Sequence, residues 1–188
     1  MPTDRHHLAL YAGSFDPITL GHLDVLGRAR GIFDSLVLGI GDNPEKPALF
    51  SFKERIDMAT QLVDEMVTSE PDGCPVQVKH YSGLTVDFAR EVGAAAILRG
   101  IRNISDLAAE TQLAITNRQV AGIETLFVVT GENFAYTSSS LIKQVAALGG
   151  SLDGLAGIVP PLVIVHLKAK RDDPSNPLGR LAKDQLVE

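Results

Sequence analysis

The chain has 188 residues and is 45% apolar, which suits one globular domain with a substantial core. Its formal charge of −6 argues against a surface that coats nucleic acid, so any site for phosphate must be local. The single cysteine, Cys74, excludes an intrachain disulfide and the cysteine spacings of metal sites, and it fits a reducing cytoplasm.

The first predicted elements are a strand, a tight loop and a helix. The strand covers the apolar run 8–11, and Gly13 and Asp16-Pro17 mark the loop, where we expect Asp16 to bond backbone amides ahead of the proline. Apolar positions resume at helical spacing after Gly21, which places His22 on the first turn of the helix. Free backbone amides at that turn favour anions, and a donor imidazole beside them is typical of a phosphate site.

A glycine-rich turn followed by a surface histidine is the better interpretation of Gly13 or His22 taken alone. It does not explain the ordered set, which comprises Ser14, Asp16, Pro17, Thr19, Gly21 and His22. This set favours a functional loop.

Strands and helices alternate along the rest of the chain. The further predicted strands are 36–40, 76–81, 94–98 and 124–129. Helices are predicted from the first loop to about 34, after the capping box Ser51–Glu54, at 85–92, at 105–119, from Ser138 or Ser139 to 147, and from Pro160-Pro161 to about 170. This order predicts an α/β fold, a Rossmann-like doubly wound five-stranded parallel sheet, with the ligand beyond the carboxyl ends of the strands.

We expect a single domain over 1–170 and a linker or disordered tail over 171–188. The segment before residue 8 lacks the long apolar core of a signal peptide, and the apolar run 158–167 is too short to cross a bilayer. These features predict a cytoplasmic protein that binds neither nucleic acid nor a membrane.

Two arginines follow the fourth predicted strand directly. Arg99 and Arg102 flank Gly100, and a guanidinium group binds phosphate oxygens in a bidentate way, so the segment favours a phosphate clamp. Ordinary surface charges are an equally good interpretation of Arg-Gly-x-Arg alone. Asp106 and Glu110 share a helix stripe with Leu113 and Asn117 and could orient the arginines or bind a ribose, although a solvated face is the better interpretation for Asp106.

Two further segments carry groups suited to phosphate. Hydroxyls and free amides at Ser138-Ser139-Ser140 suit the β and γ phosphates of a nucleotide, whereas a plain N-cap needs only one serine. Lys46, between two prolines, could reach an incoming phosphate or simply be solvated. The remaining histidines show no metal-ligand spacing, and motifs of P-loop kinases, dehydrogenases and serine hydrolases are absent from the sequence.

Taken together, these motifs resemble the phosphopantetheine adenylyltransferases, a family of the nucleotidyltransferase superfamily marked by Thr/His-x-Gly-His. The matching segments are Gly13–Pro17 with Thr19–His22, Asn43–Lys46, Ser82–Thr85, Arg99–Arg102, Asp106 with Glu110, and Ser138–Leu141. The resemblance implies in-line transfer of the AMP moiety of ATP to 4′-phosphopantetheine, giving dephospho-CoA and pyrophosphate without a covalent enzyme intermediate. It also implies Mg²⁺ bound through the ATP phosphates, no protein-built metal site, feedback by CoA and a homohexamer.

The resemblance assigns roles by position. It implies that His22, Lys46 and Arg99 are catalytic, with His22 stabilising the α-phosphoryl transition state. It assigns ATP to Ser14, Phe15, His22, Gly100, Ile101, Arg102, Glu110, Phe134, Ala135, Tyr136, Thr137, Ser138, Ser139 and Ser140, and phosphopantetheine to Ser14, Lys46, Leu84, Thr85 and Arg99. Phe134-Ala135-Tyr136 departs from the aromatic-Ser-Phe run common in the family, as Ala12 and Leu20 depart from a frequent proline and asparagine.

Two alternatives remain open at this point. One is another nucleotidyltransferase of the superfamily, with nicotinamide mononucleotide or an alcohol phosphate as acceptor, against which Arg99–Arg102, Lys46 and Ser82–Thr85 argue. The other is a nucleotide- or CoA-binding module without catalysis, which would not need both Lys46 and His22.

Overall fold

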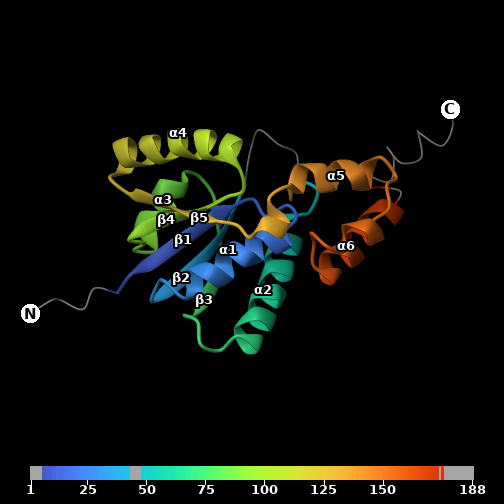
Figure 1. Ribbon diagram of the computed structural model, residues 1–188, viewed down its shortest axis with the longest axis horizontal. Helices are drawn as coiled ribbons and strands as arrows, with labels where there is room; N and C mark the ends of the chain where they lie inside the picture. The colour runs from blue at the N-terminus through green and yellow to red at the C-terminus, as the bar shows by residue number, and fades with distance from the viewer. Residues whose placement is uncertain (1–5, 43–47, 174, 176–188) are drawn as a thin grey trace, which may run out of the picture.

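A parallel sheet organises the fold, seen in a computed structural model that describes residues 6–42, 48–173 and 175 (Figure 1). Within these residues the sheet has five strands in the order β3-β2-β1-β4-β5. The strands are β1 (Leu8–Gly13), β2 (Ser35–Gly41), β3 (Val76–Tyr81), β4 (Ala96–Ile101) and β5 (Glu124–Val129). Every pairing between neighbours is parallel, which confirms the predicted sheet.

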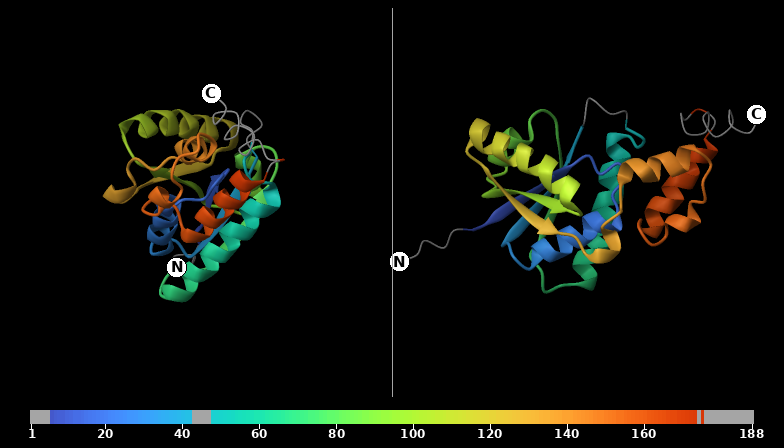
Figure 2. Two further views of the ribbon diagram at one scale, coloured as in Figure 1. Left: turned by 90° about the vertical axis from the view of Figure 1, so that its right-hand side faces the viewer. Right: turned by 45° about the horizontal axis from the view of Figure 1, so that its top comes forward.

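Helices cover both faces of the sheet, so the predicted doubly wound architecture is also confirmed. The helices are α1 (Leu20–Arg30), α2 (Phe52–Ser69), α3 (Thr85–Glu91), α4 (Ile104–Ala121), α5 (Ser139–Ala147) and α6 (Pro161–Asp172). The chain runs outward from β1 to β3, then crosses to β4 and β5. Right-handed crossovers therefore put α1 and α2 on one face and α3 and α4 on the other, as Figures 1 and 2 show.

Two apolar cores lie on the two faces because successive strand residues point to opposite sides. Ala9 and Tyr11 of β1 belong to the larger core, with α1, α2, α5 and α6. Leu10 and Ala12 belong to the smaller core, which α3 covers through Val86, Phe88 and Ala89. Burial on both sides explains why these strands are near-continuous apolar runs in the sequence.

Local signals set most element boundaries. Ser51 caps α2 in a capping box with Glu54, and the Ser138 hydroxyl accepts from the Leu141 amide to start α5, as expected. Two predicted boundaries are wrong by more than two residues. The strand predicted to end at residue 98 continues to Ile101, because β4 pairs with β5 as far as Ile101 and Val129, so Arg99 and Gly100 lie in the strand.

The second correction concerns the first helix, which was expected to reach about residue 34. Helix α1 ends at Arg30, because Gly31 forms its C-cap and turns the chain toward β2. At the other end of the chain, α6 reaches Asp172, and most of the predicted tail 171–188 lies outside the described residues. In the part of the chain that the structure describes, no helix combines the length and apolarity needed to cross a membrane.

Candidate active site

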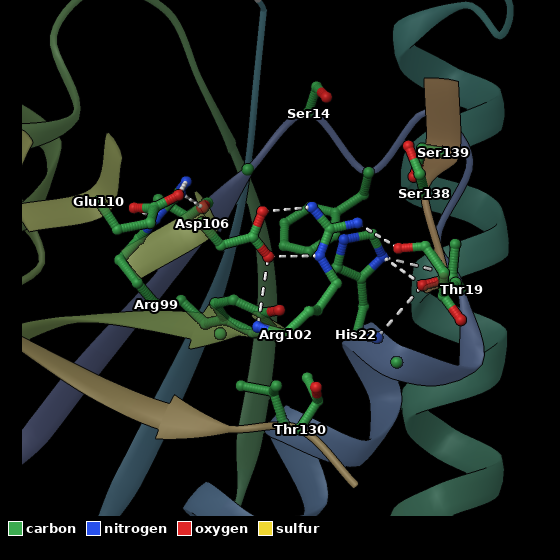
Figure 3. Close-up of a pocket in the computed structure, with 18 of the residues that line it drawn as sticks. Ser14, Thr19, His22, Arg99, Arg102, Asp106, Glu110, Thr130, Ser138 and Ser139 are labelled. Carbon is green, nitrogen blue, oxygen red and sulfur yellow. Dashed lines mark hydrogen bonds and ion pairs between the residues drawn. The ribbon is translucent and has the colours of Figure 1, made fainter. Parts of the chain in front are cut away.

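A cavity of about 330 Å³ lies at the carboxyl ends of β1 and β4, where the strand order reverses. This is the place where doubly wound sheets bind their ligands. The loop after β1, the first turn of α1, the α4 face toward β4 and the start of α5 all contribute to it (Figure 3). The sequence-predicted residues that line it are Ser14, Phe15, His22, Arg99, Gly100, Arg102, Asp106, Glu110, Thr137, Ser138, Ser139 and Ser140.

His22 is held by its own helix cap. Its Nδ1 accepts from the Thr19 backbone N–H at 3.0 Å and lies 3.0 Å from the Thr19 hydroxyl, while its amide donates to that hydroxyl. Because Nδ1 accepts a hydrogen bond from a backbone amide, the neutral ring carries its proton on Nε2. Burial, and then the charges of Arg102 and Arg99, lower the pKa of His22 to about 4. At neutral pH the ring is therefore an uncharged donor through Nε2.

Aromatic rings fix the plane of this imidazole. The Phe15 ring meets His22 edge to face with centroids 5.1 Å apart, and Tyr11 meets Phe15 at 5.3 Å. Phe15 has φ +46, and its ring covers Gly13 so closely that a Cβ there would lie 3.1 Å from it. A side chain at position 13 would therefore have to push the Phe15 ring aside by a few tenths of an ångström. Burial raises the pKa of Tyr11, so its phenol stays protonated.

Hydrogen bonds to carboxylates and backbone carbonyls hold Arg99 and Arg102. Arg99 donates from Nε and Nη2 to Glu110 at 2.6 Å each and from Nη1 to the Ala12 carbonyl at 2.7 Å. Arg102 donates from Nε and Nη2 to Asp106 at 2.6 and 2.9 Å, and from Nη1 to the Thr137 carbonyl. Each guanidinium group thus donates from Nε and Nη2 to a carboxylate of α4 and from Nη1 to a backbone carbonyl, which leaves one further N–H on each Nη atom. The solvated-face interpretation of Asp106 is wrong, because β4 brings Arg102 within reach of it.

The ion pairs shift the pKa values of their members. Burial alone would raise the pKa of Asp106, but the hydrogen bonds and charge of Arg102 bring it below its ordinary value. Burial likewise disfavours a charged Arg99, yet the hydrogen bonds and charge of Glu110 outweigh it and raise the pKa of Arg99. Among the described lining residues, two positive charges face two negative ones, so these four side chains give the cavity no net charge.

Asp16 shapes the loop, but not through the amides that were expected. Its buried carboxylate accepts from the backbone N–H groups of Leu49 and Phe50 at 2.9 Å each and from Lys143 of α5 at 2.9 Å. The Asp16 carboxylate therefore binds amides of the chain that follows β2, and not the amides just ahead of Pro17 that were predicted. Ser139 donates to the Pro17 carbonyl at 2.9 Å, which docks the start of α5 on the same loop.

Some predicted residues lie apart from the cavity lining. Ile101 is buried in the sheet, Leu84 is exposed, and the Thr85 hydroxyl pairs with that of Tyr81 at 2.8 Å. The Tyr136 side chain is 92% exposed. Phe134 and Ala135 are also outside the lining set, and Lys46 lies outside the described residues.

Sequence reasoning missed several residues that matter here. Tyr11 and Thr130 line the cavity from the ends of β1 and β5, and their position at strand ends is the signal that could have indicated them. Arg55 was missed as well, because a charged residue beside the apolar stripe of a helix is ordinary, and only the fold shows that this one is buried.

Comparison with known proteins gives consistent results. The sequence model of the cytidylyltransferase-like family matches residues 10–145. The phosphopantetheine adenylyltransferase of Rhodopirellula baltica is 45% identical over 171 residues, which cover 90% of this chain and 92% of that protein. That of Desulfosudis oleivorans is 43% identical over 164 residues, covering 87% and 92%.

Among solved structures, a bifunctional NMN adenylyltransferase/ADP ribose pyrophosphatase from Francisella tularensis is similar, with a TM-score of 0.64 and 16% identity. The match covers 97% of this chain and 54%, about half, of that protein. At this identity the likeness concerns the fold alone.

Proposed function

The chain belongs to the cytidylyltransferase-like family and, within it, to the phosphopantetheine adenylyltransferases, and we propose from its site geometry how it performs their reaction. It transfers the adenylyl group of ATP to 4′-phosphopantetheine and releases pyrophosphate, a step of coenzyme A biosynthesis. The observation that carries the mechanism is the neutral, cap-held His22 in a cavity at the carboxyl ends of β1 and β4.

The reaction is an in-line displacement at the α-phosphorus of ATP. An oxygen of the acceptor phosphate forms the new bond, and the bond to the bridging oxygen breaks with its electron pair leaving on pyrophosphate. We assign His22 Nε2–H to an oxygen on the α-phosphorus, where charge develops in the transition state. His22 keeps its proton throughout, because the acceptor phosphate is already an anion and needs no base.

The remaining phosphates of ATP fit Arg102 and the start of α5. Arg102 offers outer N–H groups, and the first amides of α5, at Ser139 and Ser140, lack helical partners. We extend the nucleotide site to Ser14, Phe15, Gly100, Ile101, Glu110 and residues 134–138. We assign the acceptor to Ser14, Lys46, Leu84, Thr85 and Arg99, with Lys46 and Arg99 catalytic beside His22.

Mg²⁺ fits this site as a companion of ATP. The acidic side chains that line the cavity, Asp106 and Glu110, already bind arginines, so the described residues offer a divalent ion no unengaged carboxylate. The charges of these residues cancel, so neutralisation of the triphosphate falls to a cation that ATP carries. When bound with ATP, Mg²⁺ would offset the negative charge of the phosphates, while Arg102 and the start of α5 hold the nucleotide.

We also propose self-association and feedback. Strand β5 lies at the edge of the sheet with Leu126 and Val129 exposed, and α4, packed beside it, exposes Leu113 and Val120. A clustered apolar surface of this kind supports a homo-oligomer. The number of six subunits and feedback by CoA rest on the resemblance, whereas a cytoplasmic location is proposed from the single cysteine, Cys74, which fits a reducing compartment.

The direct test supplies purified protein with Mg-ATP and 4′-phosphopantetheine and measures pyrophosphate and dephospho-CoA. Parallel reactions offer nicotinamide mononucleotide or an alcohol phosphate as acceptor. We expect products only with phosphopantetheine. Adenylylation of another acceptor would refute the substrate assignment, and ATP binding without turnover of any acceptor would leave a binding module.

A further inference from the structure

Arg55 joins the two loops that follow β1 and β2. It lies near the start of α2 and is only 2% exposed. Its Nη1 donates to the carbonyl oxygens of Ser14 and Gly41 at 2.9 Å each, and its Nη2 donates to the Asp42 carboxylate at 2.5 Å. The loop between β1 and α1, residues 14–19, is called the reaction loop below. One guanidinium group therefore holds the backbone of the reaction loop, at Ser14, against the end of β2, at Gly41.

The chemistry of arginine suits this place. The guanidinium carbon lies 4.7 Å from the centre of the Phe52 ring, which covers one face of the group. Among the described residues the Nε atom is buried without a hydrogen-bond partner, and the acceptors of this side chain there are the Ser14 and Gly41 carbonyls and the Asp42 carboxylate. A lysine has one ammonium group and could not span the same three acceptors in a fixed plane.

The same reaction loop is also fastened to residues 49 and 50. Asp16, two residues after Ser14, accepts the amides of Leu49 and Phe50. The chain after β2 is thus attached to the reaction loop at Asp42 through Arg55 and at Phe50 through Asp16. Arg55 itself does not line the cavity, whereas Ser14 does, so Arg55 acts on the site through Ser14.

We propose that Arg55 is a positioning residue for the acceptor: by fixing the Ser14 carbonyl against Gly41 and Asp42, it sets where the acceptor phosphate lies relative to the α-phosphorus. The inference rests on the proposed function, which assigns Ser14 to the acceptor. Ser14 is also assigned to ATP, but the other nucleotide contacts, at Arg102 and α5, come from elements that Arg55 does not touch, so the effect of Arg55 falls mainly on the acceptor.

Arg30 offers a matched control within the chain. It is 3% exposed and, like Arg55, donates to backbone carbonyls of a loop, those of Glu70, Gly73 and Cys74. That loop leads into the amino end of β3, at the opposite end of the sheet from the cavity. A purely structural role therefore predicts the same outcome for Arg30→Lys as for Arg55→Lys.

The experiment measures KM for each substrate, kcat and the melting temperature in wild type, Arg55→Lys and Arg30→Lys. Calorimetry measures Kd for 4′-phosphopantetheine and for ATP in parallel. We expect both variants to melt at lower temperature. We expect only Arg55→Lys to raise KM and Kd for the acceptor, by about tenfold, with the values for ATP within about twofold of wild type.

The proposal would be overturned if KM and Kd for the acceptor stay within twofold of wild type in Arg55→Lys. It would also be overturned if they rise equally in Arg30→Lys, or if KM and Kd for ATP rise as much in Arg55→Lys as those for the acceptor. If Arg55→Lys does not fold, Asp42→Asn decides, because this exposed carboxylate can be changed while the carbonyl contacts remain. It should raise the acceptor constants about threefold, and unchanged constants would overturn the proposal.

Failure of the proposed function is a separate outcome. A wild-type protein that adenylylates a different acceptor refutes the function, and the same comparison is then made with that acceptor. If the wild-type protein shows no turnover, the calorimetric Kd for 4′-phosphopantetheine becomes the deciding measurement. A Kd that is the same in Arg55→Lys and wild type then overturns the role of Arg55.

Discussion

Replacing Glu110 by Gln tests whether burial, rather than distance, gives the Arg99 pair its strength. The side chains of Arg99 and Glu110 are 25% and 19% exposed and meet through two hydrogen bonds of 2.6 Å. The amide keeps one acceptor oxygen but places N–H groups against the guanidinium donors. Hydrogen bonds to charged groups contribute about 1.5–3 kcal/mol to the free energy of unfolding, so this free energy should be about 2 kcal/mol lower in Glu110→Gln. That corresponds to a melting temperature lower by roughly 4–8 °C in a chain of this size.

Asp57→Asn is the matched control for this measurement. Lys53 and Asp57 also meet at 2.6 Å, but their side chains are 83% and 57% exposed. An exposed pair of this kind contributes about 0.5 kcal/mol or less, so the control should melt within roughly 2 °C of wild type. Differential scanning calorimetry of both variants at one pH gives the comparison. A Glu110→Gln shift no larger than that of Asp57→Asn would refute the reasoning.

Three further predictions concern His22. His22→Ala should lower kcat by about 10²–10³ with little change in the KM for ATP, because the lost Nε2–H donor acts on charge that forms in the transition state. Retained turnover with weakened ATP binding would contradict this. In the unfolded chain the His22 ring has its ordinary pKa, whereas the folded protein lowers this pKa to about 4. Between these two values the unfolded state binds more protons than the folded state. The free energy of unfolding should therefore fall as the pH drops through this window. Urea unfolding at several pH values should show that the free energy of unfolding changes less steeply with pH in His22→Gln, which has no imidazole, than in wild type. An equal pH dependence in the two proteins would exclude His22 as its cause. Thr19→Val should lower the free energy of unfolding by about 1 kcal/mol through loss of the helix cap. It should reduce kcat less than His22→Ala, because the Thr19 N–H still holds Nδ1, and stopped-time assays with thermal melts measure both effects.

Much of the fold could be predicted because its signals are local. The strands β3 and β5 have the predicted bounds, and α2 and α5 start at the predicted serine caps. Apolar runs, caps and loop residues act within one turn or one strand, so neighbouring residues suffice to recognise them. The end of β4 was misplaced because pairing with β5, which is 28 residues away at Ile101 and Val129, decides where the strand stops.

The sequence by itself determined the element order, the parallel sheet, the loop that carries His22 and the segments that supply arginines and serines. Only the tertiary structure decided what these groups contact. Arg99 meets a carbonyl 87 residues away, Asp16 accepts an amide 34 residues away, and Arg55 reaches back 41 residues to Ser14. Such contacts depend on how the strands and helices pack together, and no local pattern encodes that. Many of the residues that line the cavity could therefore be predicted, whereas the carbonyls and the buried arginine that hold them in place had to be found in the fold.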